Sequence, residues 1–392
     1  MERKKGFIFG IIGTAWLFDA MDVGLLSFIM PIVHQEWTLT NSQTGLISSI
    51  STIGMICGGF LFGYLADRIG RKNTLMLTLV LFSLGNFILA FASGFYPFVI
   101  IRFFVGMGLG GELPVAATYV SDLYHGKRRS QMLILADAFW ALGWLVASFL
   151  SFVLSGVLSW RGLLIITAIS AFFAIVVRKH VPEIRQPQVK KHKSFQLVEF
   201  LNFKTIMLWL SWFMVMFSYY GMFMWLPGIM ASKGNSIVDS FGYSVIIIVD
   251  QLPGYFTAAW LAKKIDLRYI FIIYMLGTAV GAVLFGMAER PLAIVLCGCV
   301  LSFFNLGAYG TIIAITPSLY ETEIRGTMTG IAEGIGRIGA VIGPLLVGIL
   351  IDQQITMTAI FATFMISLII GAASMLLIPQ IKEKMLEGEG NQ

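Results

Sequence analysis

Long uncharged stretches rich in apolar residues recur along the whole chain, and they limit its fold more than any other feature. Charged residues make up 12% of the 392 residues, whereas soluble domains average about 25%. With 57% hydrophobic residues and a mean hydropathy of +0.84, a water-soluble fold would carry more apolar side chains than its interior can hold. The excess must face lipid, so the sequence predicts a membrane protein.

Apolar runs between charged or turn-forming breaks predict twelve membrane-spanning segments. About 20 residues cross a hydrocarbon core of roughly 30 Å, and each span must be helical because lipid offers no partner for backbone groups. The first run is too long for a signal-peptide core and is expected to remain as a span. The predicted spans are 7–32, 43–66, 74–93, 97–121, 131–156, 160–178, 205–230, 239–262, 268–288, 291–316, 327–350 and 356–379.

Basic residues gather in alternate connections between these spans. Arg161, Lys233 and Arg290 fall on one side, Arg102 and Arg337 lie within spans, and the remaining Lys and Arg residues fall on the other side. Connections rich in Lys and Arg face the cytoplasm. We therefore expect a multi-pass protein of the plasma membrane with both termini in the cytoplasm. The net charge of +6 marks these loops and does not indicate a nucleic-acid surface.

A constant shift of 196 residues, half the chain length, aligns the second half of the sequence with the first. The shift places Trp16 on Trp212, Pro31 on Pro227, Arg129 on Arg325, Asp137 on Glu333 and Gly143 on Gly339. The predicted organisation is a bundle of residues 1–178, a basic cytoplasmic linker of residues 179–204, and a second bundle of residues 205–392. The expected fold is all-α, with twelve transmembrane helices in two pseudo-symmetric six-helix bundles around a central cleft.

Three loop segments, residues 63–72, 121–129 and 317–326, combine charged residues with glycines or a proline, and they resemble the cytoplasmic gate motifs of the major facilitator superfamily. Glycines permit close helix contact and a tight turn, and charged groups can latch to neighbouring helix ends. The second gate motif departs from the family pattern at Ser318 and Glu321, which leaves Glu323 as a substitute acid. The resemblance implies gating roles for Gly63, Asp67, Arg68, Gly70, Arg71, Asp122, Arg129, Glu323 and Arg325.

Four charged residues lie within the first and fourth predicted spans, where a charge is costly and usually faces a partner. Asp19 and Asp22 share one helical face, and Arg102 lies at a similar depth, which predicts an ion pair across the outer cleft. Glu112 closes the glycine-rich segment that begins at Arg102. The pair is either a structural bridge or a proton-exchange site. This set resembles the proton site of sugar and aromatic-acid symporters of the superfamily.

Aromatic and polar residues gather near the middle of other predicted spans. Asp137, Trp140 and Trp144 share one face of the fifth span, and Tyr219 and Tyr220 lie on the seventh. Glu333 and Arg337 are spaced i, i+4 and can pair with each other, which is the alternative to a role in ligand binding. Together with Gln251, Asn305 and Tyr309, these residues predict a central polar and aromatic site.

Six further segments carry a more specific pattern: residues 16–28, 106–116, 217–227, 251–256, 301–308 and 336–339. Through them, nearly the whole chain resembles the bacterial niacin permeases of this superfamily. It implies import of niacin, as nicotinate or nicotinamide, by alternating access with a proton. Nicotinate is a flat ring with one carboxylate and a ring nitrogen. Trp140, Trp144, Tyr219 and Tyr220 would form its slot, Arg337 would bind the carboxylate, and Gln251 or Asn305 would bind the nitrogen.

Other functions remain open at this point. A proton symporter for another small aromatic acid or a sugar is the alternative within the class, and a membrane sensor that binds ligand without translocating it is the alternative from another class. An enzyme is not expected, because His34, His125, His180 and His192 lie at span ends or in loops, where they cannot build a buried metal site or nucleophile triad. We expect no cofactor, no metal, no nucleic-acid partner and a monomer.

Overall fold

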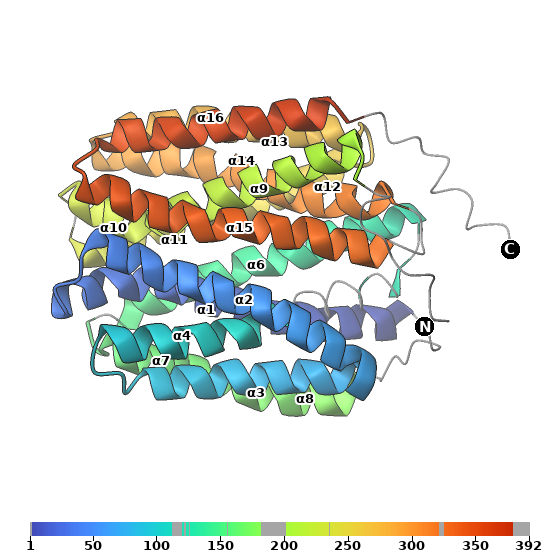
Figure 1. Cartoon of the computed structure of the whole chain (residues 1–392), viewed down its shortest axis with the longest axis horizontal. Coiled ribbons are helices and arrows are strands. Elements are labelled where there is room, and N and C mark those ends of the chain that lie inside the picture. The colour runs from blue at the N-terminus through green and yellow to red at the C-terminus, as the bar shows by residue number, and fades with distance from the viewer. Residues whose placement is uncertain are drawn as a thin grey trace, which may run out of the picture.

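The computed structural model describes residues 2–111, 120, 123–124, 126–154, 156–181, 201–234, 236–320 and 325–378. Within these ranges some side chains lie outside the description, including those of Asp67, Arg71, Arg129 and Arg325. Every regular element in the described part is helical (Figure 1). Glu112, Asp122 and Glu323, which the sequence places in the coupling site and the gates, lie outside the described residues.

The first half of the chain forms long helices joined by short connections. Its elements are α1 (Glu2–Glu36), α2 (Asn41–Ile69), α3 (Arg71–Leu89), α4 (Phe95–Gly110), α6 (Gly126–Leu154), α7 (Trp160–Ala168), the 3₁₀ helix η1 (Ile169–Phe172) and α8 (Phe173–His180). The last three run end to end and make one candidate membrane span, Trp160–His180. The second, fifth and sixth predicted spans are found within a few residues of their predicted limits.

The second half repeats this pattern. Its elements are α9 (Phe203–Phe223), α10 (Leu226–Ser232), α11 (Ile237–Val249), α12 (Gln251–Leu261), α13 (Leu267–Met287), α14 (Pro291–Ser318), α15 (Arg325–Asp352) and α16 (Met357–Leu376). Eleven segments of the described chain are long and apolar enough to cross a membrane, and α4 adds a shorter apolar helix. This pattern is consistent with the twelve spans predicted from the sequence.

Two predicted spans are interrupted near prolines. The predicted helix 205–230 ends at Phe223 and resumes as α10, because Pro227 has no N–H to bond the carbonyl of Phe223. The predicted helix 239–262 has a break at Asp250, because Pro253 has no N–H to bond the carbonyl of Val249 four residues earlier. The segment predicted as one helix over 205–230 is therefore two helices, whereas the span predicted over 239–262 is found at Ile237–Leu261 with a break at Asp250.

Close helix contacts recur at the shift of 196 residues. A Cβ atom added to Gly58 would lie 1.9 Å from the carbonyl oxygen of Met107, and one added to Gly254 would lie 2.2 Å from that of Phe303. A Cβ atom added to Gly143 would lie 2.3 Å from the carbonyl oxygen of Leu17, and one added to Gly339 would lie 2.4 Å from that of Phe213. Adding 196 to both residue numbers of the Gly58–Met107 contact gives the Gly254–Phe303 contact, and the Gly143–Leu17 contact gives Gly339–Phe213 in the same way. Glycine is required at all four because any side chain would push the backbones apart. The internal repeat is therefore present in the packing as well as in the sequence.

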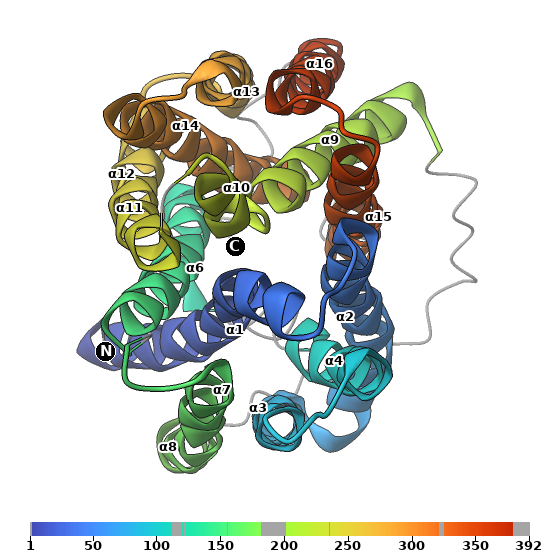
Figure 2. The same cartoon turned by 90° about the vertical axis from the view of Figure 1, so that its left-hand side faces the viewer.

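The two halves face each other across the middle of the molecule. Figure 2 shows α2 beside α15 and α6 beside α11, while α3 and α13 lie at opposite edges. Large apolar side chains such as Phe60, Phe172 and Leu292 are at least 70% exposed, as expected for lipid-facing positions. Helix α1 begins and α16 ends at one end of the bundle (Figure 1), which we call the proximal end, and the opposite end is the distal end.

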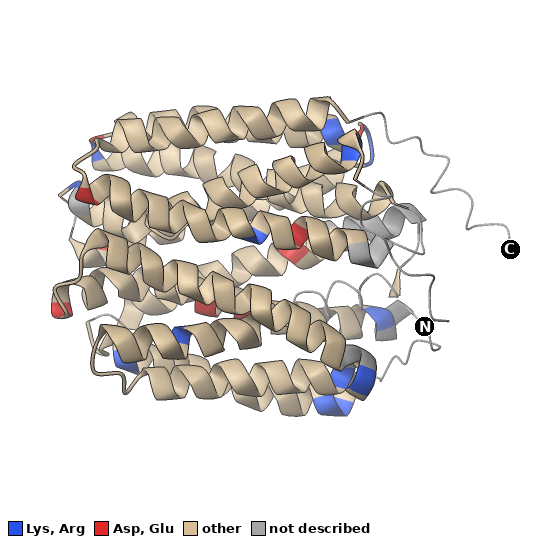
Figure 3. Ribbon diagram, viewed as in Figure 1, with Lys and Arg blue, Asp and Glu red and all other residues tan. Residues whose placement is uncertain are grey.

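Charged side chains are sparse along the middle of the bundle. In Figure 3, Lys and Arg gather at the proximal end, with a few charged groups placed within the helices. Those inside are Asp19, Asp22, Arg102, Asp137, Glu333 and Arg337, all buried or nearly so. They define where the candidate site must be sought, because buried charges need partners.

Candidate functional site

The predicted ion pair between Asp22 and Arg102 is confirmed. Arg102 Nη1 lies 3.2 Å from a carboxylate oxygen of Asp22, and the side chains are 1% and 0% exposed. Arg102 Nε donates to Ser51 Oγ at 3.1 Å, and the Asn86 amide donates to Asp22. Four helices, α1 to α4, thus each contribute one polar side chain to a buried network.

This network lies inside the first half and does not bridge the cleft between the halves. The shift of 196 residues maps Arg102 to Gly298 and Ser51 to Ile247. An added Cβ at Gly298 would meet Ile247 Cδ1 at 2.4 Å, so an isoleucine occupies the place that polar groups fill in the first half. Asp19 is also buried on α1, one turn before Asp22. The expectation of a pair across the cleft is corrected accordingly.

The aromatic residues singled out in the sequence meet between the halves. We call Trp140, Trp144, Tyr219, Tyr220 and Tyr309 the aromatic cluster. Trp140 Nε1 on α6 donates a hydrogen bond to the Tyr219 hydroxyl on α9 at 2.7 Å. The Tyr219 ring lies 6.1 Å from Trp144, 5.1 Å from Tyr220 and 5.8 Å from Tyr309, between ring centroids. Tyr219 therefore joins both halves, and each ring in the cluster is at most 7% exposed.

Arg337 and Glu333 pair with each other on α15. Arg337 Nη2 lies 2.9 Å from Glu333 Oε1, and Nη1 lies 3.3 Å from the sulfur of Met55 on α2. The alternative of self-pairing is therefore realised in this conformation. A guanidinium has five N–H donors, so this arrangement leaves further donors for a ligand.

Gln251 and Asn305 are completely buried near the same region. Gln251 is the first residue of α12 and Asn305 lies in the middle of α14, which packs against α12. Neither amide has a hydrogen-bond partner among the described residues. Buried amides without partners are costly, which makes these two side chains available to a polar ligand.

At the proximal end, one residue separates α2 from α3. Gly70 has φ +91°, which favours glycine because a Cβ atom would be strained there. The Arg68 guanidinium lies over the ring of Tyr64 at 4.4 Å. The positions 196 residues later, Lys264 and Trp260, make the equivalent contact at 3.6 Å. Gly63 has open space around it in the described structure. The expected close helix contact at Gly63 is therefore not made in this conformation.

At the distal end, the two halves are joined by hydrogen bonds to backbone groups. Ser27 Oγ on α1 donates to the carbonyls of Phe223 and Met224 at 3.1 and 2.9 Å. These carbonyls lie at the C-terminal end of α9, and Pro227 has no N–H to bond that of Phe223, so Ser27 satisfies carbonyls at the helix break. Ser27 and Phe223 are 196 residues apart, which places their contact at the axis that relates the halves.

A second distal contact joins α15 to the beginning of α2. The Asp352 carboxylate accepts the backbone N–H groups of Asn41 and Ser42 at 3.1 and 2.8 Å, as well as their side-chain donors. The first amides of a helix lack internal partners, so Asp352 caps α2 from the other half of the molecule. Gly348 allows the close approach, because an added Cβ would lie 2.4 Å from Asn41 O.

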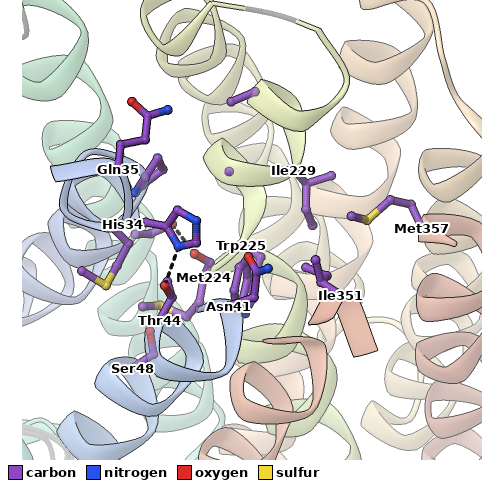
Figure 4. Close-up of a pocket in the computed structure, with 15 residues that line it drawn as sticks. His34, Gln35, Asn41, Thr44, Ser48, Met224, Trp225, Ile229, Ile351 and Met357 are labelled. Carbon is purple, nitrogen blue, oxygen red and sulfur yellow. Dashed lines mark hydrogen bonds between the residues drawn. The ribbon is translucent and has the colours of Figure 1, made fainter. Parts of the chain in front are cut away.

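A cavity of about 290 Å³ lies beyond the Ser27 contact, between the distal ends of both halves. Its polar lining includes His34, Thr44 and Ser48, and its apolar lining includes Trp225 and Met357. Figure 4 shows His34 pointing toward Thr44, with Nδ1 3.0 Å from Oγ1. The cavity reaches the contact between α1 and the end of α9, since Ser27 and Met224 also line it.

Several of these residues were missed by the sequence analysis. Ser51 and Asn86 complete the ion-pair network, and Ser27 and Asp352 join the halves. Asn86 could have been singled out, because it is a polar residue inside the predicted span 74–93 and a buried ion pair needs further hydrogen-bond partners. Ser27 and Asp352 bind backbone groups, which carry no residue-specific pattern in a sequence.

The fold, the two related halves and the buried charges between apolar helices define a multi-pass membrane transporter architecture. The family model described as Major Facilitator Superfamily matches residues 12–250 and 242–390. The chain belongs to this superfamily.

Two curated relatives match almost the full chain. One, from Bacillus subtilis and provisionally named niacin/nicotinamide transporter NiaP, is 43% identical over 385 residues, covering 96% of each protein. Another, the niacin transporter NiaP of Acinetobacter baylyi, is 34% identical over 417 residues, covering 97% of this chain and 95% of the relative. Since the relatives are named transporters, the protein is a membrane transporter of a small molecule.

Solved structures share the fold at low identity. A D-xylose–proton symporter superimposes with a TM-score of 0.79 at 19% identity, covering 96% of this chain and 98% of that one. The xylose transporter XylE from E. coli, in a partially occluded inward-open conformation, gives 0.80 at 17% identity, with 96% and 98% coverage. These likenesses establish the arrangement of the helices.

Proposed function

We propose that the protein imports niacin, as nicotinate or nicotinamide, across the plasma membrane by alternating access. The observation that carries this proposal is the 43% and 34% identity, over nearly the full chain, to relatives named for niacin transport. The aromatic cluster between the halves supports it, because a flat ring requires flat apolar walls. When the halves part, the ring inserts between the tryptophans of α6 and the tyrosines of α9 and α14.

The polar ends of the ligand find partners around the aromatic cluster. Arg337 binds the carboxylate with the donors that Glu333 and Met55 leave over. Gln251 or Asn305 binds the ring nitrogen, since both amides are buried without partners in the described part of the chain. Trp140, Trp144, Tyr219, Tyr220 and Tyr309 surround the ring.

We assign proton coupling to the buried pair of Asp22 and Arg102, and the sequence adds Asp19 and Glu112 as further candidates for this role. Protonation of Asp22 would remove the charge that Arg102 balances at 3.2 Å, and the helices that hold the two residues could then move apart. The contacts of Arg102 with Ser51 and Asn86 support this role, because these two side chains can accept hydrogen bonds from Arg102 when Asp22 is protonated.

The organisation of the chain follows from this scheme. Residues 1–178 and 205–392 act as two bundles joined by a cytoplasmic linker of residues 179–204, and the protein works as a monomer. The proximal end faces the cytoplasm, and the distal end faces outward. The proximal gate comprises Gly63, Asp67, Arg68, Gly70, Arg71, Asp122, Arg129, Glu323 and Arg325.

Counterflow of labelled nicotinate in proteoliposomes tests the function. Vesicles that contain the purified protein and are preloaded with unlabelled nicotinate should take up label, whereas protein-free vesicles should not. A sensor would bind nicotinate without label entering the lumen. A panel of benzoate, nicotinamide and xylose as competitors separates the alternatives within the class. Undiminished uptake in excess nicotinate, or stronger competition by benzoate or xylose, would contradict the proposal.

A further inference from the structure

A group of buried polar side chains between α6, α12 and α14 makes no hydrogen bond of normal geometry in the described part of the chain. Asp137, Gln251, Tyr255 and Asn305 are all 0% exposed, and the interaction nearest to a hydrogen bond within the group is that of the Tyr255 hydroxyl with the Asp137 carboxyl. Helix α12 packs against both α6 and α14, which brings the group together. Buried polar groups are nearly always satisfied, so this concentration marks a place where a ligand supplies the partners.

Asp137 is the most demanding member of the group. Neither of its carboxyl oxygens makes a hydrogen bond of normal geometry within the described structure, and the neighbour nearest to forming one is the Tyr255 hydroxyl. The ionisable groups that interact with it there are the phenols of Tyr219, Tyr220, Tyr255 and Tyr309 and the carboxyl of Glu333. None of these groups is a cation, and a buried carboxylate without a cation is very costly. The protonated acid costs far less and presents one O–H donor.

The position of Asp137 directs that donor toward the aromatic cluster. Asp137 lies three residues before Trp140 and seven before Trp144, on one face of α6. Trp140 bonds Tyr219 at 2.7 Å, so the same face of α6 reaches the rings of α9. Tyr255 approaches Asp137 from α12, one helical turn beyond Gln251. A flat ligand between the rings would present its edge to Asp137.

A ring nitrogen and a ring C–H differ most at that edge. The lone pair of a pyridine nitrogen lies in the plane of the ring and accepts a hydrogen bond, whereas the C–H of a benzene ring cannot. With a carbocyclic ligand the buried acid would remain without a partner, and this difference selects strongly between ligands of the same shape.

We propose that Asp137, supported by Tyr255, donates a hydrogen bond to the ring nitrogen of a small heteroaromatic acid and so selects it over the carbocyclic acid. This inference rests on the proposed function. It assigns the nitrogen to α6, in place of Gln251 or Asn305, and leaves those two amides to other polar edges of the ligand.

Equilibrium binding of nicotinate, isonicotinate and benzoate to the purified full-length protein tests the assignment. The three ligands share shape and carboxylate, but the nitrogen is moved in the second and absent in the third. The wild type should bind nicotinate about tenfold or more tightly than either analogue, as expected for one buried hydrogen bond. Asp137→Leu should bring the three affinities within about threefold, and Asp137→Asn, which keeps an N–H donor, should preserve the preference.

Gln251→Leu and Asn305→Leu decide between the two assignments of the ring nitrogen: if Asp137 binds it, they should weaken nicotinate, isonicotinate and benzoate alike and keep the preference for nicotinate. Tyr255→Phe should lower it several-fold, which provides a readout if Asp137→Leu does not fold. The assignment is overturned if the wild type binds nicotinate without preferring it, if Asp137→Leu keeps the preference, or if Gln251→Leu or Asn305→Leu loses it. Absence of nicotinate binding to the wild type would instead overturn the proposed function, and this inference with it.

Discussion

The carboxylate of Asp352, at the end of α15, accepts the backbone N–H of Ser42 at 2.8 Å and thereby caps α2 across the boundary between the halves. The shift of 196 residues maps Asp352 to Gly156, which has no side chain to cap α11. Helix α11 is capped instead from its own half, by Ser236, whose hydroxyl accepts the Asp239 N–H at 3.0 Å. The distal closure is thus latched on one side of the molecule.

Asp352→Ala should therefore loosen the distal closure. Loss of a helix cap costs about 1 kcal/mol, which corresponds to roughly a fivefold larger open population. The measurement is the rate at which a cysteine at Ser48, in a protein lacking Cys57, Cys297 and Cys299, reacts with a membrane-impermeant maleimide. Asp239→Ala is the control: it removes a distal carboxylate that accepts a hydrogen bond from Ser236 in the same half, so the reaction rate should not change. Equal rates in the two variants would remove Asp352 as a latch.

The Asp22–Arg102 pair gives a prediction about coupling. Asp22→Asn and Arg102→Ala should abolish accumulation driven by a proton gradient. The first variant removes the carboxyl that takes up the proton, and the second removes the cation with which that carboxylate pairs. Asp22→Asn should retain counterflow, which needs no net proton movement. Arg102→Ala should also lower stability by roughly 3–5 kcal/mol, since Asp22 is left buried without its partner. Normal accumulation with normal pH dependence in both variants would exclude the pair as the coupling site.

The fold was predictable because its main determinant is a pattern. Apolar runs follow from the cost of placing polar groups in lipid, and the side preference of basic residues fixes the direction of the spans. The repeat of 196 residues then relates the two halves. Helix breaks were less predictable. Pro227 lies at the start of α10 and Pro253 near the start of α12, yet Pro31, Pro317 and Pro344 lie inside continuous helices. A proline interrupts a helix or is absorbed by it depending on what satisfies the released carbonyls.

The residues of the site could be predicted where they carry a charge, because burying a charge within a span costs much free energy. Asp22 and Arg102 stood out because charges within spans need partners. Ser51 did not stand out, since small hydroxyl residues in spans usually bond their own helix, as Ser51 also does to Ile47 O at 3.1 Å. Its second role, as acceptor for Arg102, depends on how α2 and α4 pack. Side chains whose partners are set by packing between helices carry no signal in a single sequence.

Arg337 provides a test of how the carboxylate is bound. Arg337→Ala should weaken nicotinate by roughly 10- to 100-fold through loss of charge-assisted hydrogen bonds, and nicotinamide by much less because it has no carboxylate. The variant leaves Glu333 without its partner at 2.9 Å, so it is compared with Arg337→Ala/Glu333→Gln, which removes the unpaired charge. Binding of both ligands is measured on purified protein. Equal losses for nicotinate and nicotinamide in the double variant would exclude Arg337 as the anchor.

The hydrogen bond between Trp140 and Tyr219 makes a prediction about the closed state, since it joins α6 of one half to α9 of the other. Tyr219→Phe keeps the ring contacts with Trp144, Tyr220 and Tyr309 and removes one acceptor, which should cost about 1 kcal/mol. Trp140→Phe removes the donor and shrinks the ring. If the bond stabilises the closed cluster, the double variant should lose less thermal stability than the sum of the single variants, with an interaction energy of roughly 0.5–1.5 kcal/mol. Strict additivity would mean that the two side chains contribute independently and that the bond does not hold the halves together.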